Sequence, residues 1–257
     1  MNPHPGDTGR VKERQAFSGL LVFMAAAALF AAPAPAVAAE RDPAWPKYTG
    51  WQGCSAPVWS STRATGEPGR GARVLVIGDS HIRNSASEVK FQLKKSGWTP
   101  TVRCWGGKRL DWGRAQVARA KKLNQLPENV VIALGTNDMR WIDRRVTRSR
   151  MAALVDQIGP KRNIFWVETY AGNADRFSKS KQKWFNDEVR KLARKHPNVR
   201  VVPWGSEARS SGVRFVDGLH YRGVDYRLMV KFIADELNSV LTAADPPEPS
   251  LVAPPIA

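Results

Sequence analysis

The sequence predicts an α/β fold: one three-layer α/β/α domain in which helices cover both faces of a parallel sheet. From residue 73 onward, short apolar runs alternate with longer stretches whose apolar residues recur at helical spacing. The first, third and fourth of these runs are apolar almost throughout, which is typical of parallel strands that are buried on both faces. Five such runs lie within residues 72–242, and no internal repeat divides them. One domain therefore accounts for that whole range.

The first three strands are expected at residues 74–77, 101–104 and 130–134. The first run, Val-Leu-Val-Ile, ends at Gly78, where the backbone can turn sharply toward a helix that we expect through about residues 85–95. A second helix is expected around residues 114–123. Proline lacks the amide hydrogen that a continuing helix needs, so Pro127 separates this helix from the third strand.

Two further strands and three helices complete the predicted domain. Gly159-Pro160 ends a helix expected at residues 148–158, and the run Asn-Ile-Phe-Trp-Val at 163–167 follows as the fourth strand. The fifth strand is the short run at 199–202. Amphipathic helices flank it at about residues 181–195 and 224–241. Their apolar stripes are Trp184, Phe185, Val189, Leu192 and Ala193 in one helix, and Tyr226, Met229, Val230, Ile233, Leu237 and Leu241 in the other.

Residues 1–39 have the three parts of a secretory signal peptide. A basic region at 10–14 precedes an apolar run at 20–32, and small residues then permit cleavage near Ala38 or Ala39. The alternative is an uncleaved membrane anchor, although the apolar run is short for a membrane span. We therefore expect a bacterial protein that is secreted or associated with the cell envelope.

Two more segments flank the predicted domain. Residues 40–71 are rich in Trp, Pro, Gly and Ser without a clear period, and we interpret them as an extended arm anchored by Trp45, Trp51 and Trp59. Residues 243–257 are proline-rich and are expected to form a disordered tail.

The charge of the chain narrows the classes of partner. The formal net charge is +17 at pH 7 and the sequence pI is about 10.4. Such a chain favours polyanionic neighbours, which include nucleic acid, anionic lipid and an acidic cell-wall polymer. No nucleic-acid-binding motif is evident and export argues against that partner, so no nucleic acid is expected. We expect a monomer.

The chain contains two cysteines, Cys54 and Cys104. In an exported protein an even pair predicts a disulfide, which would tie the arm to the domain. The alternative is two unrelated buried thiols. No spacing of cysteine and histidine typical of a metal site surrounds them, so we expect no metal.

Candidate catalytic residues lie in four stretches near the ends of predicted strands. Gly-Asp-Ser at 78–80 follows the first strand, and Cys-Trp-Gly-Gly-Lys-Arg at 104–109 follows the second. Gly-Thr-Asn-Asp at 135–138 follows the third, and Asp-Gly-Leu-His at 217–220 precedes the last helix. In an open α/β sheet ligands bind at the carboxyl ends of the strands, so we expect the four stretches to gather there.

These stretches supply the groups that acyl transfer requires. Ser80 is placed as a nucleophile, and His220 can accept its proton. Asp217 lies three residues upstream of His220, near enough to orient the imidazole. The backbone N–H groups of Ser80 and Gly107 and the side-chain amide of Asn137 can donate hydrogen bonds to an oxyanion. No organic cofactor or metal is needed for this chemistry.

In this order, the four stretches resemble the sequence blocks of the SGNH (GDSL-type) hydrolase family. The resemblance covers about residues 72–242 and implies a flavodoxin-like sheet of five parallel strands. It implies that Ser80 is the nucleophile, that Asn137 is an oxyanion donor, and that Asp217 and His220 complete the catalytic set.

The glycine block and the residue after Ser80 match the family pattern less clearly. Gly106 and Gly107 both fit the glycine block, and the basic residue that follows favours Gly107. Leucine is commoner than histidine directly after the serine in this family, so His81 is a departure. The simpler interpretation is that His81 is a solvated loop residue. The alternative is that His81 is a second candidate for the catalytic base.

Together these inferences predict an exported serine esterase that hydrolyses small acyl esters, O-acetyl groups on an envelope or extracellular polysaccharide being the expected substrate. One alternative is an O-acyltransferase that passes the acyl group to a glycan hydroxyl. Another is a non-catalytic protein that binds an anionic wall polymer. Trp105, Arg140 and Trp141 are candidates for substrate binding, and the arginines between residues 140 and 150 are candidates for contact with an anionic glycan.

Overall fold

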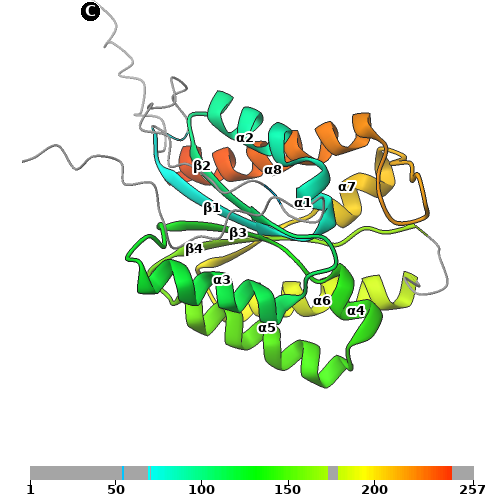
Figure 1. Cartoon of the computed structure of the whole chain (residues 1–257), viewed down its shortest axis with the longest axis horizontal. Coiled ribbons are helices and arrows are strands. Elements are labelled where there is room, and N and C mark those ends of the chain that lie inside the picture. The colour runs from blue at the N-terminus through cyan, green and yellow to red at the C-terminus, as the bar shows by residue number, and fades with distance from the viewer. Residues whose placement is uncertain (1–53, 55–68, 70, 173–178, 245–257) are drawn as a thin grey trace, which may run out of the picture. The chain divides into compact units, whose positions relative to one another are not determined.

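The computed structural model describes residues 54, 69, 71–172 and 179–244, all of which belong to one compact unit. They form five strands and eight helices (Figure 1). The predicted signal peptide, the predicted tail from residue 245 onward and the three tryptophans of the predicted arm (Trp45, Trp51 and Trp59) lie outside the described residues; residues 243 and 244, where the tail was expected to begin, are helical. Those three expectations therefore stay predictions.

The strands form one parallel sheet in the order β2-β1-β3-β4-β5. This is the flavodoxin-like order of a doubly wound sheet, and it confirms the predicted fold class. The last two strands have the bounds that the sequence predicts. The strands are β1 (Arg73–Gly78), β2 (Thr99–Cys104), β3 (Asn129–Ala133), β4 (Asn163–Val167) and β5 (Val199–Val202).

Helices cover both faces of the sheet (Figure 1). Those on one face are α1 (Ser80–Asn84), α2 (Ala86–Lys95), α7 (Trp204–Ser210) and α8 (Gly223–Ala244). Those on the other face are α3 (Leu110–Lys122), α4 (Thr136–Trp141), α5 (Arg144–Ile158) and α6 (Lys179–Lys195).

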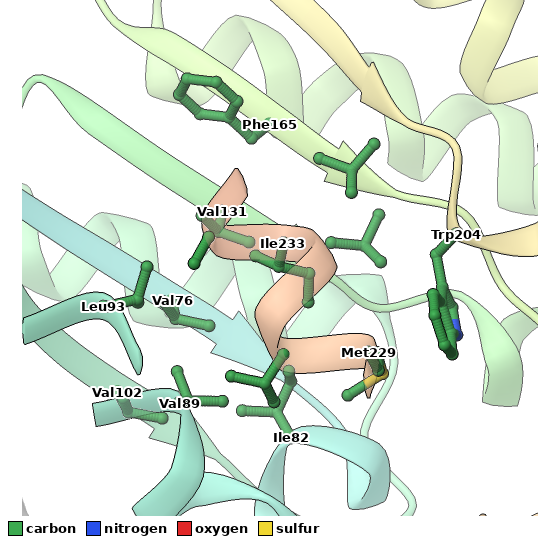
Figure 2. Close-up of a cluster of buried hydrophobic side chains, with 14 of the residues drawn as sticks. Val76, Ile82, Val89, Leu93, Val102, Val131, Phe165, Trp204, Met229 and Ile233 are labelled. Carbon is green, nitrogen blue, oxygen red and sulfur yellow. The ribbon is translucent and has the colours of Figure 1, made fainter. Parts of the chain in front are cut away.

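Each strand contributes to two hydrophobic cores, because successive side chains point to opposite faces of a sheet. In β1, Val74 and Val76 pack under α2 and α8, whereas Leu75 and Ile77 pack under α3 and α5. Figure 2 shows the first core, in which Ile233 of α8 lies among side chains of the sheet and of α2. The two buried faces explain why β1, β3 and β4 are apolar along most of their length.

The sequence pattern missed three short helices, α1, α4 and α7, which have five to seven residues each. Fewer than two full turns give no apolar period to detect. Helix α5 also begins four residues earlier than expected. The Asp143 side chain caps it by accepting hydrogen bonds from the backbone N–H groups of Arg145, at 2.7 Å, and Val146, at 3.3 Å.

None of the helices in the described ranges is both long and apolar enough to cross a membrane.

Candidate active site

Three of the four predicted stretches begin at strand ends that are level with one another. Gly78 at the end of β1 pairs in register with Cys104 of β2 and with Ala133 of β3. The loops that follow therefore start side by side at the carboxyl edge of the sheet. A Cβ at Gly78 would overlap the buried side chain of Ile82, so only glycine allows α1 to fold back so closely onto β1.

Ser80 is the first residue of α1, and Asp79 caps that helix. The Asp79 carboxylate accepts a hydrogen bond from the backbone N–H of His81 at 3.0 Å. Ser80 is only 7% exposed and Asp79 only 1%. The turn that carries the serine is thus fixed by a helix cap and by the core beneath it.

A chain of hydrogen bonds joins Ser80, His220 and Asp217. The Ser80 Oγ lies 2.9 Å from His220 Nε2, and His220 Nδ1 lies 2.7 Å from Asp217 Oδ2. With Nδ1 donating to the carboxylate, Nε2 is free to accept the serine proton. The structure therefore brings together three residues that the sequence separates by up to 140 positions.

Local hydrogen bonds keep Asp217 charged. Its Oδ1 accepts from the backbone N–H groups of His220, at 2.7 Å, and Leu219, at 3.0 Å. Partial burial alone would raise the pKa of Asp217, but these N–H groups and the His220 ring lower it to about 2. The carboxylate is ionised at any ordinary pH and can orient and stabilise a charged imidazole.

The loop that contains His220 is anchored by the residue that follows it. Tyr221 is buried, its hydroxyl donates to the carbonyl of Tyr170 at 2.6 Å, and it accepts from Trp204 Nε1 at 3.0 Å. The sequence analysis gave Tyr221 no role. A tyrosine after a candidate base does not by itself indicate a structural role. That role depends on hydrogen-bond partners that lie 17 and 51 positions away in the sequence.

Asn137 lies in the first turn of α4, beside the Ser80 turn and the glycine loop. Its side-chain amide donates to the Lys108 carbonyl at 3.0 Å and to Asp79 Oδ2 at 3.4 Å. Gly107, next to Lys108, has a φ of +75°, which glycine adopts without strain. The Asn137 amide thus ties the Gly107 loop to the Ser80 turn.

Two buried carboxyl groups support this arrangement. Burial, together with the charge of Asp138, raises the pKa of Asp79 to about 7. Burial likewise raises the pKa of Asp138 to about 6, against the lowering effect of the Leu110 N–H, which donates to Asp138 Oδ2 at 3.0 Å. Both aspartates belong to motifs that the sequence singled out, but the sequence analysis assigned neither a role.

His81 is buried instead of solvated, so the simpler interpretation of it was wrong. Its ring centroid lies 4.6 Å from that of Tyr221 and 5.8 Å from that of His220. Neither ring nitrogen has a hydrogen-bond partner among the described residues. Burial, and then the neighbouring His220, lower the pKa of His81 to about 3. His81 is therefore neutral and packed behind His220, and Ser80 has His220 as its hydrogen-bonded partner.

The candidate substrate-binding residues lie after the ends of β2 and β3, one in a loop and two in the short helix α4. Trp105 is half-buried, and its backbone N–H donates to the carbonyl of Gly78 at 3.2 Å. Trp141, at the end of α4, is 56% exposed, and the Arg140 guanidinium lies 4.3 Å from its ring centroid. Arg140, which is partly buried, and Trp141 are three and four residues from Asn137 on the same short helix.

The arginines that follow do not form one free cationic patch. Arg144 packs over the ring of Trp184, Arg148 pairs with Glu188 at 2.9 Å, and Arg150 pairs with Asp111 at 3.2 Å. Arg148 and Arg150 therefore have acidic partners within the protein.

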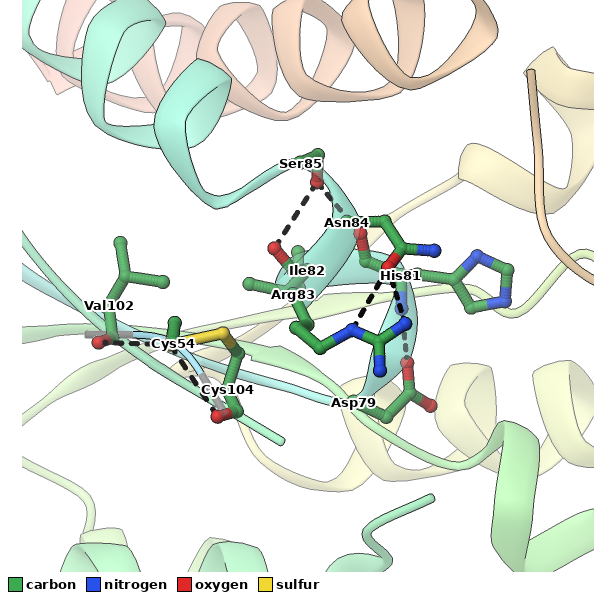
Figure 3. Close-up of a disulfide and its surroundings, with 9 residues drawn as sticks. All are labelled: Cys54, Asp79, His81, Ile82, Arg83, Asn84, Ser85, Val102 and Cys104. Carbon is green, nitrogen blue, oxygen red and sulfur yellow. Dashed lines mark hydrogen bonds between the residues drawn. A yellow bond between two sulfur atoms is a disulfide. The ribbon is translucent and has the colours of Figure 1, made fainter. Parts of the chain in front are cut away.

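The predicted disulfide is present between Cys54 and Cys104, whose Cα atoms are 5.3 Å apart. The backbone N–H of Cys54 also donates to the carbonyl of Cys104 at 3.1 Å. The bond ties residue 54 to the end of β2, next to β1, the strand that leads to Ser80. Figure 3 shows the His81 ring projecting from α1 on the side away from the disulfide.

No group of three or more His, Cys, Asp or Glu side chains in the described part of the chain is arranged to hold a metal ion.

Strand order and the four loops together define the class of the domain: it has the fold of the SGNH (GDSL-type) hydrolases. Solved structures with this fold include the catalytic domain of the peptidoglycan O-acetyltransferase OatA from Streptococcus pneumoniae. It is 18% identical, with a TM-score of 0.57, over 68% of this chain and 96% of that one.

Two esterases have similar structures. The acetyl xylan esterase Axe2 from Geobacillus stearothermophilus is 15% identical, with a TM-score of 0.53, over 65% of this chain and 94% of that one. The esterase EstA from Pseudoalteromonas sp. is 17% identical, with a TM-score of 0.51, over 66% of this chain and 99% of that one. At these identities the likeness establishes the fold. Comparisons of the sequence with family models and with curated proteins found no match.

Proposed function

We propose that this protein is an exported serine esterase that removes small acyl groups, chiefly O-acetyl, from a polysaccharide of the envelope or the extracellular space. The observation that carries the proposal is the hydrogen-bonded chain Ser80–His220–Asp217 at the carboxyl edge of an SGNH-type sheet. The similarity to an acetyl xylan esterase and to a peptidoglycan O-acetyltransferase supports an acetylated carbohydrate as the substrate.

The reaction proceeds through an acyl-enzyme. The Ser80 oxygen attacks the ester carbonyl carbon while its proton passes to His220 Nε2. The oxyanion accepts hydrogen bonds from the N–H groups of Ser80 and Gly107 and from the Asn137 amide. The C–O bond to the alcohol then breaks, and the alcohol leaves with the proton from His220. Water, deprotonated by His220, attacks the acyl-enzyme and releases the acid and free Ser80.

Asp217 holds the His220 ring through Nδ1 and stabilises the imidazolium that forms in each half of the reaction. Arg140, the exposed Trp141 and the half-buried Trp105 contact the alcohol part of the substrate. We retain a monomer that requires no cofactor as part of this proposal.

Turnover of p-nitrophenyl acetate by the mature protein tests the proposed chemistry. Ser80→Ala should lower kcat by about 10⁴-fold or more, because the nucleophile and its proton transfer are lost. Ser149→Ala, at an exposed serine of α5, is the matched control and should turn over at the wild-type rate. Equal rates for Ser80→Ala and wild type would contradict the serine mechanism, and dependence of the rate on acyl chain length would define the acyl group.

The second candidate function is O-acyl transfer to a glycan hydroxyl, which the similarity to an O-acetyltransferase domain favours. In that reaction the glycan hydroxyl takes the place of water in the second step. Product analysis with and without a glycan acceptor separates the two functions: acetate alone supports the esterase, and an acetylated acceptor supports the transferase. A protein that binds an anionic glycan but does not react with an active-site phosphonate would overturn both.

A further inference from the structure

A groove lies between helices α5 and α6, which belong to the layer that covers one face of the sheet; Figure 1 shows where these two helices lie. It encloses about 430 Å³, within the range of about 300–1,000 Å³ that is typical of ligand pockets. Met151, Ala152 and Leu192 line its apolar part. None of the residues that line it belongs to the Ser80–His220–Asp217 chain.

The rim of the groove is strongly basic. Arg145, Arg148, Lys191 and Lys195 line it, with Glu188 as the one acidic side chain among the described lining residues. Glu188 accepts hydrogen bonds from Arg148, at 2.9 and 3.2 Å, and from Lys191, at 2.8 Å. These two cations lower the pKa of Glu188, so it is ionised, and four cations face one anion.

The remaining two cations are available to a ligand. The side chains of Arg145 and Lys195 are exposed, and no acidic side chain among the described residues pairs with them. Glu188 instead orients Arg148 and Lys191 through its hydrogen bonds to both side chains. The groove therefore combines two cations that Glu188 orients with two that make no salt bridge to a described acidic side chain, although the charge of Arg145 also lowers the pKa of Asp143, the capping residue of α5.

The charges follow the groove lengthwise. Arg145 and Arg148 are three residues apart on α5, and Lys191 and Lys195 are four apart on α6, so each pair lies on one helix face. A separation of three or four residues corresponds to about 4.5–6 Å along a helix. Two parallel rows of charge at this spacing fit a chain with repeated negative charges better than a single small anion.

We propose that this groove binds a linear acidic polysaccharide, with sugar faces on the apolar floor and carboxylate or phosphate groups on the two basic rows. A single-stranded nucleic acid is disfavoured, because its bases stack on aromatic side chains and no Phe, Trp or Tyr is among the described residues that line the groove. The site is separate from the proposed esterase site and would hold the protein on an acidic glycan while esters are cleaved elsewhere.

Affinity electrophoresis of the mature protein in gels that contain polygalacturonate tests the proposal, at two salt concentrations. Neutral deacetylated xylan is the uncharged comparison, and a phosphate-bearing wall glycan distinguishes the two sources of charge. The double variant Arg145→Glu/Lys195→Glu should weaken binding by about tenfold or more. Ala152→Trp should also weaken binding, because it fills the groove without a change of charge.

The matched control is Lys121→Glu/Lys122→Glu, which changes the net charge equally at two exposed positions on α3. This control should retain most of the binding. Equal weakening in both double variants would show that general surface charge is responsible and would overturn the groove site. Absence of binding by wild type, or tighter binding of single-stranded DNA than of either glycan, would also overturn it.

Turnover of p-nitrophenyl acetate should remain at the wild-type level in all three variants, and their thermal unfolding should be cooperative. Failure of the groove proposal would leave that activity unchanged. Failure of the proposed esterase would remove the activity from wild type without affecting glycan binding.

Discussion

Two regions supply the hydrogen-bonded chain of the site, and they are held in different ways. The serine turn, residues 78–81, lies against the core, and Asp79, Ser80 and His81 are each at most 7% exposed. The histidine loop, residues 211–222, is irregular and largely exposed; the Asp217 side chain is 54% exposed and that of His220 is 26% exposed.

Short-range hydrogen bonds shape the histidine loop. The N–H of Val216 donates to the carbonyl of His220 at 2.8 Å, and the N–H of Arg222 donates to that of Arg214 at 3.1 Å. Val213 and Tyr221 are the residues of this stretch that are buried in the core. The difference implies that changes in the serine turn affect stability, whereas changes to the exposed side chains of the histidine loop affect activity alone.

Among the variants that distinguish the histidine loop from the serine turn, His220→Ala is expected to have the largest effect, and that effect is on kcat. It should lower kcat for p-nitrophenyl acetate by about 10⁴-fold, because Ser80 loses its only hydrogen-bonded base among the described residues. The midpoint of thermal unfolding should change little, since the ring is partly exposed and packs loosely. Asp217→Asn should cause a smaller loss of kcat, because the ring keeps its place while the charge is lost.

The double variant Ser80→Ala/His220→Ala provides the control for that prediction. Residues that act as one unit are not additive, so the double variant should be about as slow as Ser80→Ala alone. A product of the two single losses would mean that Ser80 and His220 act independently. A large drop in the unfolding midpoint of His220→Ala would contradict the difference drawn between the two regions.

The next effect is on stability, and it belongs to the serine turn. Gly78→Ala places a Cβ against the buried side chain of Ile82 and should lower the free energy of unfolding by about 3 kcal/mol. The matched variant in the histidine loop is Gly212→Ala, where φ is +64° and a Cβ has open space around it. Its cost should be only about 1 kcal/mol, from the left-handed backbone. Urea unfolding of both measures the difference, and equal costs would contradict it.

The sequence predicted the fold well because burial on both faces of the sheet leaves a clear pattern. The bounds of β4 and β5 agree with the structure: four apolar residues follow Asn163 in β4, and three valines mark β5. The short helices α1 and α4 were missed although they carry Ser80 and Asn137, because a helix of five or six residues is set by its cap and its neighbours. The sequence motifs nevertheless singled out Ser80 and Asn137 as candidate site residues, although the short helices that carry them were not predicted.

The positions of His81 and Tyr221 could not be predicted in the same way. Whether a histidine beside the serine is solvated or buried depends on Tyr221 and Tyr226, which are 140 and 145 positions away in the sequence and have ring centroids 4.6 and 6.1 Å from that of His81. No local pattern specifies such a contact. The same holds for the basic groove, where α5 and α6 each show only an ordinary charged face until they lie together.

The smallest expected effect concerns His81 and the dependence of stability on pH. The folded-state pKa of His81 is lowered to about 3, mainly by burial, whereas an unfolded chain has an ordinary histidine pKa of about 6.5. Between these values the unfolded state binds a proton that the folded state does not. Stability is therefore lost as pH falls below 6.5, by about 1.4 kcal/mol per pH unit.

His81→Leu removes the titrating ring. Between pH 6.5 and pH 5 the free energy of unfolding of the variant should therefore fall by about 2 kcal/mol less than that of wild type. Asp79 opposes the trend, because its raised pKa favours the folded state as pH falls from 7 toward 4, but it is present in both proteins and cancels in the comparison. Urea unfolding of both proteins at several pH values measures the difference. Parallel curves would mean that the His81 ring gains a proton in the folded state, and that the serine turn is open to water as the histidine loop is.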